Sequence, residues 1–179
     1  MNIHRCMVLI DGSNFYFKLK DLSLHNLLEF NFAGFAKSIC GNKKIVGATY
    51  YVGKVRTSGS EGSKKMQANQ QKLFANLRKN KFKYSLGYLL KSGGKMHEKG
   101  VDVNIAVDML VAVYEDLCDH IILVSSDTDL LPAIKKAREK GKTVEYVGFS
   151  HQPSLAMVAN CSESRLLKKE DLEPFIKSK

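Results

Sequence analysis

The sequence predicts an α/β protein, a three-layer sandwich in which helices cover both faces of a central, mainly parallel sheet of about five strands. Short apolar runs of strand length alternate along the chain with segments that show a helical period. Such alternation is typical of right-handed βαβ units and therefore of a parallel sheet. No internal repeat or long linker divides the chain, so we expect a single domain over residues 1–179.

The expected strands are apolar or β-branched runs bounded by turn residues. They are residues 6–10, 45–52, 83–90, 120–124 and 143–147, with a further short extended piece at 165–167. The first of them, with the sequence CMVLI, is apolar throughout and ends at Asp11-Gly12. A continuous apolar run of this length is typical of a strand that is buried on both faces of the sheet.

The expected helices show apolar residues at helical spacing, and several end at a recognisable stop signal. They are residues 14–22, 32–40, 64–80, 101–117, 130–140, 153–160 and 169–175. Residues 57–63 and 91–100 are rich in Gly, Ser and Lys and are predicted to be loops. We regard residues 151–179 as a C-terminal helical extension and assign it no role.

The composition favours a basic, globular protein. The chain has 28 Lys and Arg against 18 Asp and Glu, a formal net charge of +10, and 44% of its residues are hydrophobic. A surface of this charge attracts polyanions such as nucleic acids. No stretch reaches the roughly 18 apolar residues that a membrane span requires. The apolar run before Asp11 is too short for a signal peptide, so we expect a cytoplasmic protein that does not contact a membrane.

The cysteine spacing argues against a zinc knuckle or a redox motif. Cys6, Cys40, Cys118 and Cys161 form no CxxC pair, and each lies in or beside an apolar segment. We expect buried free thiols in a reducing compartment.

Aspartates follow two of the predicted strands. Asp11 follows the first strand, and Asp127 and Asp129 follow the fourth. Parallel sheets bind ligands at the carboxyl ends of their strands, where the strand order reverses. If these two strands are neighbours, the aspartates face each other, and such crowding favours a divalent cation with oxygen ligands. Two simpler interpretations stay open: Asp11 as a turn residue and Asp127 as a helix cap.

Two further acids lie on the expected helix over 101–117. Asp102 is in its first turn, where a carboxylate also complements the helix dipole. Asp108 comes six residues later, so it points about 120° away from Asp102. It either reaches the site from the side, supports it, or lies on the surface.

Three stretches, in this order along the chain, resemble a known family. They are Asp11-Gly-Ser-Asn14, Lys99-Gly-Val-Asp102 and Ser125-Ser-Asp-Thr-Asp129. Together they resemble the NYN domain, the LabA-like branch of the PIN-like nuclease superfamily, over about residues 5–150. The resemblance implies a PIN-like, Rossmann-like sheet, a site for Mg²⁺ or Mn²⁺, and hydrolysis of RNA or DNA that leaves a 5′-phosphate and a 3′-hydroxyl.

The resemblance also implies roles for individual residues. The catalytic and metal-binding set carried over by position is Asp11, Asp102, Asp127 and Asp129, where the ion would lower the pKa of an attacking water. Asn14 matches the polar partner of the first aspartate, and Asp108 matches an acid further along the helix. We expect Ser125 and Ser126 either to contact a carboxylate, a water or a phosphate, or to be simple turn hydroxyls.

Basic and aromatic residues are the candidates for gripping a single-stranded or structured RNA. The predicted phosphate contacts are Lys54, Arg56, Lys64, Lys65, Lys95 and Lys99, each of which is otherwise a solvated surface residue. Phe15, Tyr50 and Tyr51 are candidates for stacking on bases, although at least one of the two tyrosines is expected in the core.

Two other functions remain open at this point. One is a non-catalytic RNA-binding module on the same fold. The other is a metal-dependent nucleotide-sugar enzyme that uses Asp127-Thr-Asp129 as a DxD motif, which leaves Asp11 unexplained. Neither GxGxxG nor GxxxxGK[ST] occurs, so the sequence favours neither a dinucleotide-binding protein nor a P-loop ATPase. The resemblance also allows a homodimer.

Overall fold

The computed structural model describes residues 4–24, 26–55, 59–92 and 95–176. Within these ranges the chain forms a seven-stranded sheet in the order β4-β3-β2-β1-β5-β6-β7. The strands are β1 (Arg5–Asp11), β2 (Lys44–Gly53), β3 (Lys83–Ser92), β4 (Lys95–Lys99), β5 (His120–Val124), β6 (Thr143–Phe149) and β7 (Glu163–Leu167). Neighbouring strands are parallel, except that β4 runs antiparallel to β3. The predicted, mainly parallel α/β sheet is confirmed, and the two strands beyond the expected five are its edges.

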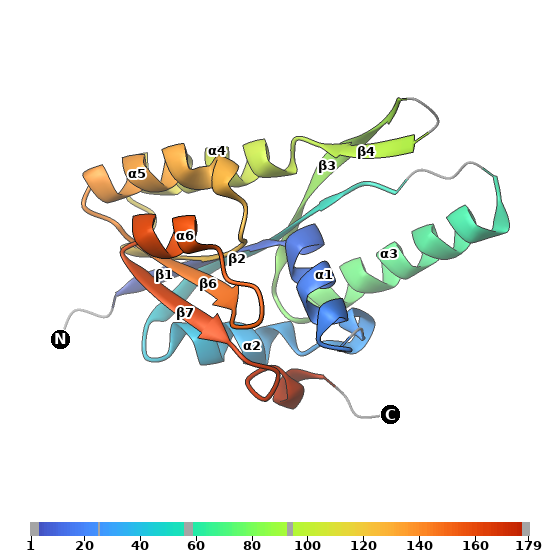
Figure 1. Cartoon of the computed structure of the whole chain (residues 1–179), viewed down its shortest axis with the longest axis horizontal. Coiled ribbons are helices and arrows are strands. Elements are labelled where there is room, and N and C mark those ends of the chain that lie inside the picture. Colours follow the sequence, from blue (N-terminus) through green and yellow to red (C-terminus); the bar gives the residue numbers. More distant parts are fainter. Residues whose placement is uncertain (1–3, 25, 56–58, 93–94, 177–179) are drawn as a thin grey trace.

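Helices cover both faces of this sheet, which makes the molecule a three-layer sandwich (Figure 1). On one face lie α1 (Gly12–Asp21), α2 (Phe32–Cys40) and α3 (Glu61–Lys79). On the other lie α4 (Val101–Tyr114), α5 (Leu131–Glu139) and α6 (Leu155–Asn160). Single turns of 3-10 helix are η1 (Leu27–Glu29), η2 (Thr128–Leu130) and η3 (Glu173–Phe175).

The alternation of side chains along the central strands builds two cores. In β1, Val8 and Ile10 pack into the core beneath α1, α2 and α3, whereas Leu9 packs into the core beneath α4, α5 and α6. All three side chains are at most 1% exposed. A strand that is buried on both faces needs a continuous apolar run, which is why CMVLI has no polar alternation.

The strand order reverses between β1 and β5. From β1 the chain builds outward to β2 and β3 on one side, and it later returns to β5 and continues to β6 on the other. β1 and β5 pair in parallel, with Ile10 opposite Val124. The condition on which the predicted aspartate site depends is therefore met: β1 and β5 are neighbours, and the residues that follow them meet at the carboxyl edge of the sheet.

Residues 95–99 correct the prediction of a loop over 91–100. They form β4, which extends the sheet beyond β3. A strand at the edge of a sheet is paired on one side only, so it does not require the apolar pattern by which buried strands are recognised.

The helix predicted over 169–175 is also wrong. The chain there makes turns and only the short η3. Pro174 lies inside this segment, and a proline has no backbone N–H and clashes with the preceding helical turn. Helix α3 begins at Glu61, inside the loop predicted over 57–63, because the Ser60 side chain caps it by accepting a hydrogen bond from the Ser63 amide.

None of the helices in the described part of the chain combines the length and the hydropathy that a bilayer crossing requires.

Candidate functional site

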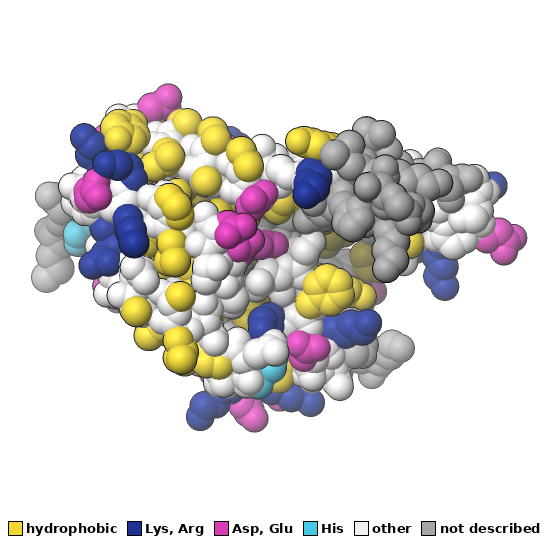
Figure 2. Space-filling view, turned by 45° about the horizontal axis from the view of Figure 1, so that its top comes forward, with side chains coloured by type: hydrophobic (Ala, Val, Ile, Leu, Met, Phe, Trp, Pro, Cys, Tyr) yellow, Lys and Arg dark blue, Asp and Glu magenta, His cyan; other side chains and the backbone are white. Residues whose placement is uncertain are grey.

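A cavity of about 440 Å³ opens at the carboxyl edge of the sheet, beside the point where the strand order reverses. We call it the acidic cavity. It is lined by Asp11, Ser13, Asn14, Phe17, Lys99, Gly100, Val101, Asp102 and Asp127. Acidic side chains gather near the centre of the face shown in Figure 2, with lysine or arginine side chains on either side of them. The fold thus brings three of the four predicted metal-binding aspartates to one cavity.

Asp11 is the last residue of β1 and also the N-cap of α1. Its Oδ1 accepts a hydrogen bond of 3.0 Å from the Asn14 amide, and its Oδ2 accepts one of 3.0 Å from the hydroxyl of Ser125. The residue is only 8% exposed. A carboxylate buried to this extent must be hydrogen-bonded to remain charged, and both of its oxygens are. The cap holds the carboxylate at the cavity wall.

Polar contacts tie the ends of β1 and β5 together. The Ser125 hydroxyl donates to Asp11 and accepts a 3.2 Å hydrogen bond from the Asp127 amide. The Asn14 side-chain oxygen accepts a 3.3 Å hydrogen bond from the Ser126 amide. The hydroxyls of Ser126 and Tyr146 lie 2.9 Å apart and share a hydrogen bond. The expectation that Ser125 contacts a carboxylate is met, and Asn14 is a bridge between the two strand ends.

Asp127 and Asp129 take different positions although they are two residues apart. Asp127 is half-buried, lines the acidic cavity, and caps η2 by accepting a 2.9 Å hydrogen bond at Oδ1 from the Asp129 amide. Its Oδ2 makes no hydrogen bond with any described residue. Asp129 is exposed and is not among the described residues that line the cavity. A metal-binding role for Asp129 stays a prediction.

A sharp turn between β4 and α4 brings Lys99 and Asp102 to the same cavity. Gly100, which joins the two elements, has a φ of 80°, a left-handed conformation that favours glycine because it lacks a Cβ atom. Asp102 is half-buried in the first turn of α4, and Lys99 is exposed. Asp102 therefore lies in the first turn of α4, where a carboxylate complements the helix dipole, and also on the cavity wall.

Asp108 lies further along α4 and is not among the residues that line the cavity, so a supporting role for it stays a prediction. It is exposed, and its Oδ2 accepts a 2.7 Å hydrogen bond from the hydroxyl of Tyr51. Tyr51 is fully buried and lies opposite Asp11 in the pairing of β1 with β2. Burial, and then the Asp108 carboxylate, raise the pKa of Tyr51 well above its usual value, so it is a hydrogen-bond donor at any physiological pH. The hydrogen bond therefore ties α4 to β2 at the residue that pairs with Asp11.

The predicted phosphate contacts are spread over the molecule. Lys99 lines the acidic cavity, whereas Lys54, Lys64 and Lys65 are exposed and are not among its described lining residues. Arg56 and the side chain of Lys95 lie outside the described residues.

The prediction that Phe15, Tyr50 and Tyr51 stack on bases is wrong, whereas the expectation that at least one of the two tyrosines lies in the core is confirmed. All three are at most 1% exposed, and the Tyr50 hydroxyl donates a 3.2 Å hydrogen bond to the Gly12 carbonyl. Exposed aromatic residues near the cavity include Phe17, which lines it, and Tyr16, the preceding residue of α1. The sequence contains a signal that could have shown this. Phe15 and Leu19 are four residues apart and therefore share one buried face of α1, so Tyr16 and Phe17 point away from that face.

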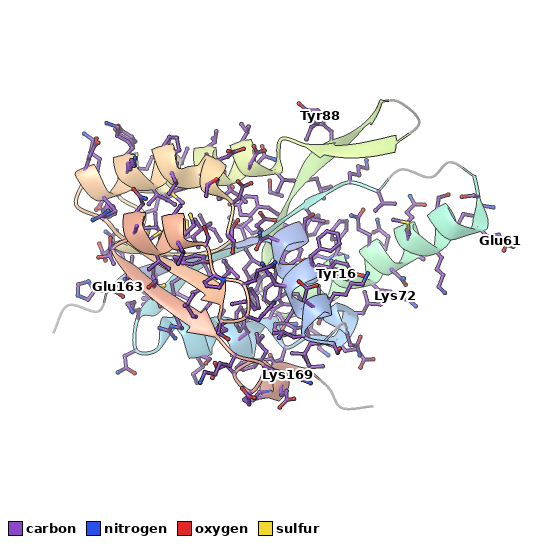
Figure 3. The ribbon with its side chains drawn as sticks, in the orientation of Figure 1. Tyr16, Glu61, Lys72, Tyr88, Glu163 and Lys169 are labelled. Carbon is purple, nitrogen blue, oxygen red and sulfur yellow. The ribbon has the colours of Figure 1, made fainter. Side chains whose placement is uncertain are left out.

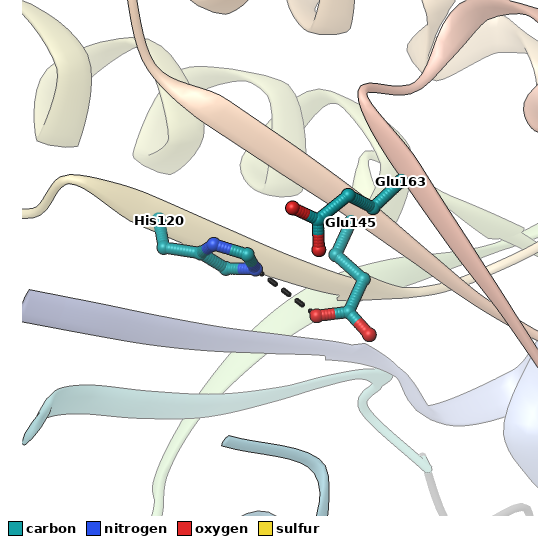
Figure 4. Close-up of side chains that lie close together, drawn as sticks. All are labelled: His120, Glu145 and Glu163. Atoms are coloured by element: carbon teal, nitrogen blue, oxygen red, sulfur yellow. Dashed lines mark hydrogen bonds and ion pairs between the residues drawn. The ribbon is translucent and has the colours of Figure 1, made fainter. Parts of the chain in front are cut away.

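A second group of titratable side chains lies toward the amino ends of β5, β6 and β7. A nitrogen of His120 and an oxygen each of Glu145 and Glu163 lie within 4.8 Å of one another, close enough to hold one metal ion (Figure 4). However, the oxygens of Glu145 already contact His120 Nε2 at 3.0 Å and Arg165 Nε at 2.9 Å. These contacts neutralise Glu145, which is 3% exposed. We interpret the group as an ion-pair network that holds the outer strands together.

Glu145→Gln is expected to lower the free energy of unfolding at pH 7 by about 1–3 kcal/mol. Removing one partner of a fully buried ion pair costs about 3–5 kcal/mol. Because Arg165 is partly exposed, water compensates part of that loss. Urea unfolding followed by circular dichroism measures the difference, and Glu163→Gln, at an exposed residue of the same group, is the matched control. Equal stability of the two variants would contradict the interpretation.

The same pair has a predictable pH dependence. Burial alone raises the pKa of Glu145, but the His120 hydrogen bond and the Arg165 charge outweigh burial and lower it. A carboxyl whose pKa is lower in the folded state stabilises the fold above its unfolded pKa of about 4.3 and loses that contribution as the pH falls further. The stability difference between the wild type and Glu145→Gln should therefore shrink below about pH 4.3.

Comparisons with known proteins identify the family and the fold of the chain. The model of the NYN domain family matches residues 5–167. An uncharacterized protein of Methanocaldococcus jannaschii, MJ0482, is 37% identical over 91 residues, a match that spans 48% of this chain and 38% of that protein. The structure of a protein of unknown function from Vibrio parahaemolyticus, VPA0982, has the same fold, with a TM-score of 0.72 at 20% identity over 95% of this chain and 96% of that one.

A flap endonuclease of bacteriophage T5, solved with DNA and metal ions, is a more remote neighbour, with a TM-score of 0.42 at 16% identity over 87% of this chain and 60% of that one. The family match is stronger evidence than this structural likeness, because it extends from β1 through β7 and includes every residue of the acidic cavity. On this evidence the chain belongs to the NYN domain family.

Proposed function

We propose that this protein is a metal-dependent nuclease that hydrolyses phosphodiester bonds of RNA at the acidic cavity. The observation that carries the proposal is the convergence of Asp11, Asp102 and Asp127 on one cavity from three separate elements. Two of the three carboxylates are half-buried and the third is almost fully buried. Such a cluster repels itself unless a cation balances its charge.

The residues of the cavity suit a hard divalent cation. Its acidic groups are all carboxylates, and oxygen ligands favour Mg²⁺ or Mn²⁺ over softer metals. Asp11, Asp102 and Asp127 would hold the ion. When bound, it would supply Lewis-acid polarisation of a phosphodiester and a lowered pKa for the attacking water.

The protein's own groups prepare this chemistry. The Ser125 hydroxyl and the backbone amide of Asn14 each donate a hydrogen bond to the Asp11 carboxylate, so this carboxylate is held in place before any ligand binds. A group that is oriented in advance does not need to reorganise during the reaction. Lys99, on the cavity wall, supplies a positive charge for a phosphate of the bound strand. The excess of lysine and arginine over the whole chain supports encounter with RNA.

A cleavage assay on the full chain tests the proposal. A single-stranded RNA labelled at its 3′ end, and the DNA of the same sequence, are incubated with the protein in Mn²⁺, Mg²⁺ or EDTA. We expect cleavage of the RNA in Mn²⁺ or Mg²⁺, none in EDTA, and products that carry a 5′-phosphate. RNA binding without cleavage in any metal would make the protein a non-catalytic RNA-binding module. Cleavage that persists in EDTA would exclude the metal mechanism.

A further inference from the structure

A second cavity lies directly beside the acidic cavity. It has a volume of about 410 Å³ and lies between α1 and α3, against β2. Ser13 and Phe17 line both cavities, so the two lie side by side along α1. Figure 3 shows Tyr16 on the side of α1 that faces α3. A strand whose backbone lies in the acidic cavity would therefore pass the opening of the second one.

The walls of this second cavity are apolar and partly aromatic. They include Val52, Met66 and Leu73 together with Tyr16 and Phe17. The two aromatic side chains are 40% and 59% exposed, and their ring centroids lie 5.4 Å apart in an edge-to-face arrangement. Exposed rings of this kind add little to the core of the protein. They are the side chains on which unpaired bases stack, because every base presents a flat π face.

Among the described side chains of the wall, the amide of Asn69 is available to a ligand. The amide of Gln70 is used by the fold: its Nε2 donates to the Gly53 carbonyl at 2.8 Å, and its Oε1 accepts from the Val55 amide at 3.0 Å. Asn69, the preceding residue of α3, is half-buried on the same wall and forms no hydrogen bond with any described residue. A side-chain amide offers one acceptor and two donor hydrogens, which match the polar edge of a nucleobase.

We propose that this second cavity, the base cavity, holds an unpaired nucleobase of the strand that is bound at the acidic cavity. Tyr16 stacks on the face of the base, Phe17 contacts it edge-on, and the amide of Asn69 pairs with its polar edge. A base inside a duplex is stacked and paired on all sides and cannot enter. The protein then acts on single-stranded or looped RNA. This inference rests on the proposed function, because it assumes that the acidic cavity receives a nucleic acid.

Binding is measured apart from cleavage, with the Asp11→Asn variant as the background. A single-stranded RNA of about ten nucleotides with one 2-aminopurine is titrated with the protein, because stacking on an aromatic ring quenches the fluorescence of this base analogue. We expect quenching, and we expect the duplex of the same sequence to bind at least about 10-fold more weakly.

Tyr16→Ala combined with Asn69→Ala should abolish the quenching and weaken single-strand binding about 10- to 30-fold, whereas Tyr16→Trp should restore the quenching. The matched control is Tyr114→Ala, since Tyr114 is an exposed tyrosine on α4, outside the residues that line the base cavity. Thermal melting establishes that each variant is folded. Equal binding by the double variant and by the control would overturn the proposal, as would equal affinity for duplex and single strand.

The outcomes separate this inference from the nuclease proposal. Quenching that depends on Tyr16 in a wild-type protein that cleaves nothing would leave the base cavity in place and remove the nuclease. Cleavage of single and double strands at equal rates would do the reverse. Displacement of the RNA by an apolar peptide but not by a mononucleotide would assign the cavity to a protein partner, and the absence of any RNA binding would end both proposals.

Discussion

Asp11→Asn is expected to lower the rate of Mn²⁺-dependent RNA cleavage by roughly 10²- to 10³-fold, the loss typical of removing one preorganised electrostatic group. The substitution removes the charge and leaves the local fold. Asparagine is as good an N-cap as aspartate, so its Oδ1 can still accept the hydrogen bond from the Asn14 amide. The Ser125 hydroxyl can accept from the new amide group, where before it donated to the carboxylate.

Initial rates on a labelled single-stranded RNA, at several Mn²⁺ concentrations, measure this effect. Asp21→Asn is the matched control, because Asp21 is an exposed aspartate at the other end of the same helix. We expect the control to cleave like the wild type. If both variants kept the wild-type rate while melting at the same temperature, Asp11 would have no part in the reaction.

Gly12→Ala, at the residue after Asp11, should lower the free energy of unfolding of the protein. A Cβ at this position would lie 2.4 Å from Tyr50 Cε1 and 2.6 Å from the Tyr51 carbonyl oxygen. The carbonyl belongs to a strand in the middle of the sheet, so it cannot move away without breaking the pairing of β1 with β2. Overpacking of this kind lowers the free energy of unfolding by about 2–3 kcal/mol.

Urea unfolding of the full chain, followed by far-ultraviolet circular dichroism, measures this loss. Gly62→Ala is the control: Gly62 lies in α3, and nothing is within 4 Å of the Cβ that the substitution would add. Alanine is favoured over glycine in a helix, so this variant should gain about 0.5–1 kcal/mol. Similar stabilities for the two alanine variants would show that β2 does not constrain the turn after Asp11.

The sequence allowed the centre of the fold to be predicted well. The apolar run of β1 and the aspartate that ends it are local features of the sequence. Such features can be recognised without knowing which elements pack together. The sequence did not predict that β1 and β5 are adjacent; it predicted only that their aspartates would meet if the two strands were neighbours. The structure meets this condition, and Asp11 and Asp127 line the same cavity.

Other features were missed because they depend on packing. The β4 strand lacks a buried face, and its pattern is therefore that of a loop. Tyr50 and Tyr51 are aromatic and therefore suggested stacking on bases, but the helices that cover the two faces of β2 bury both. Asp127 and Asp129 are equivalent in a motif, yet the 3-10 turn between them leaves one on the cavity wall and the other exposed. The base cavity forms between α1 and α3, which are far apart in the sequence.

Binding of Mn²⁺ to the full chain, measured by electron paramagnetic resonance in the absence of RNA, tests the central claim most directly. We expect the wild type to bind the ion. Asp11→Asn and Asp127→Asn should each bind it at least about 10-fold more weakly, because each substitution removes one charged oxygen ligand. Asp21→Asn should bind like the wild type. Equal uptake by all four proteins would place the ion elsewhere and contradict the acidic cavity as a metal centre.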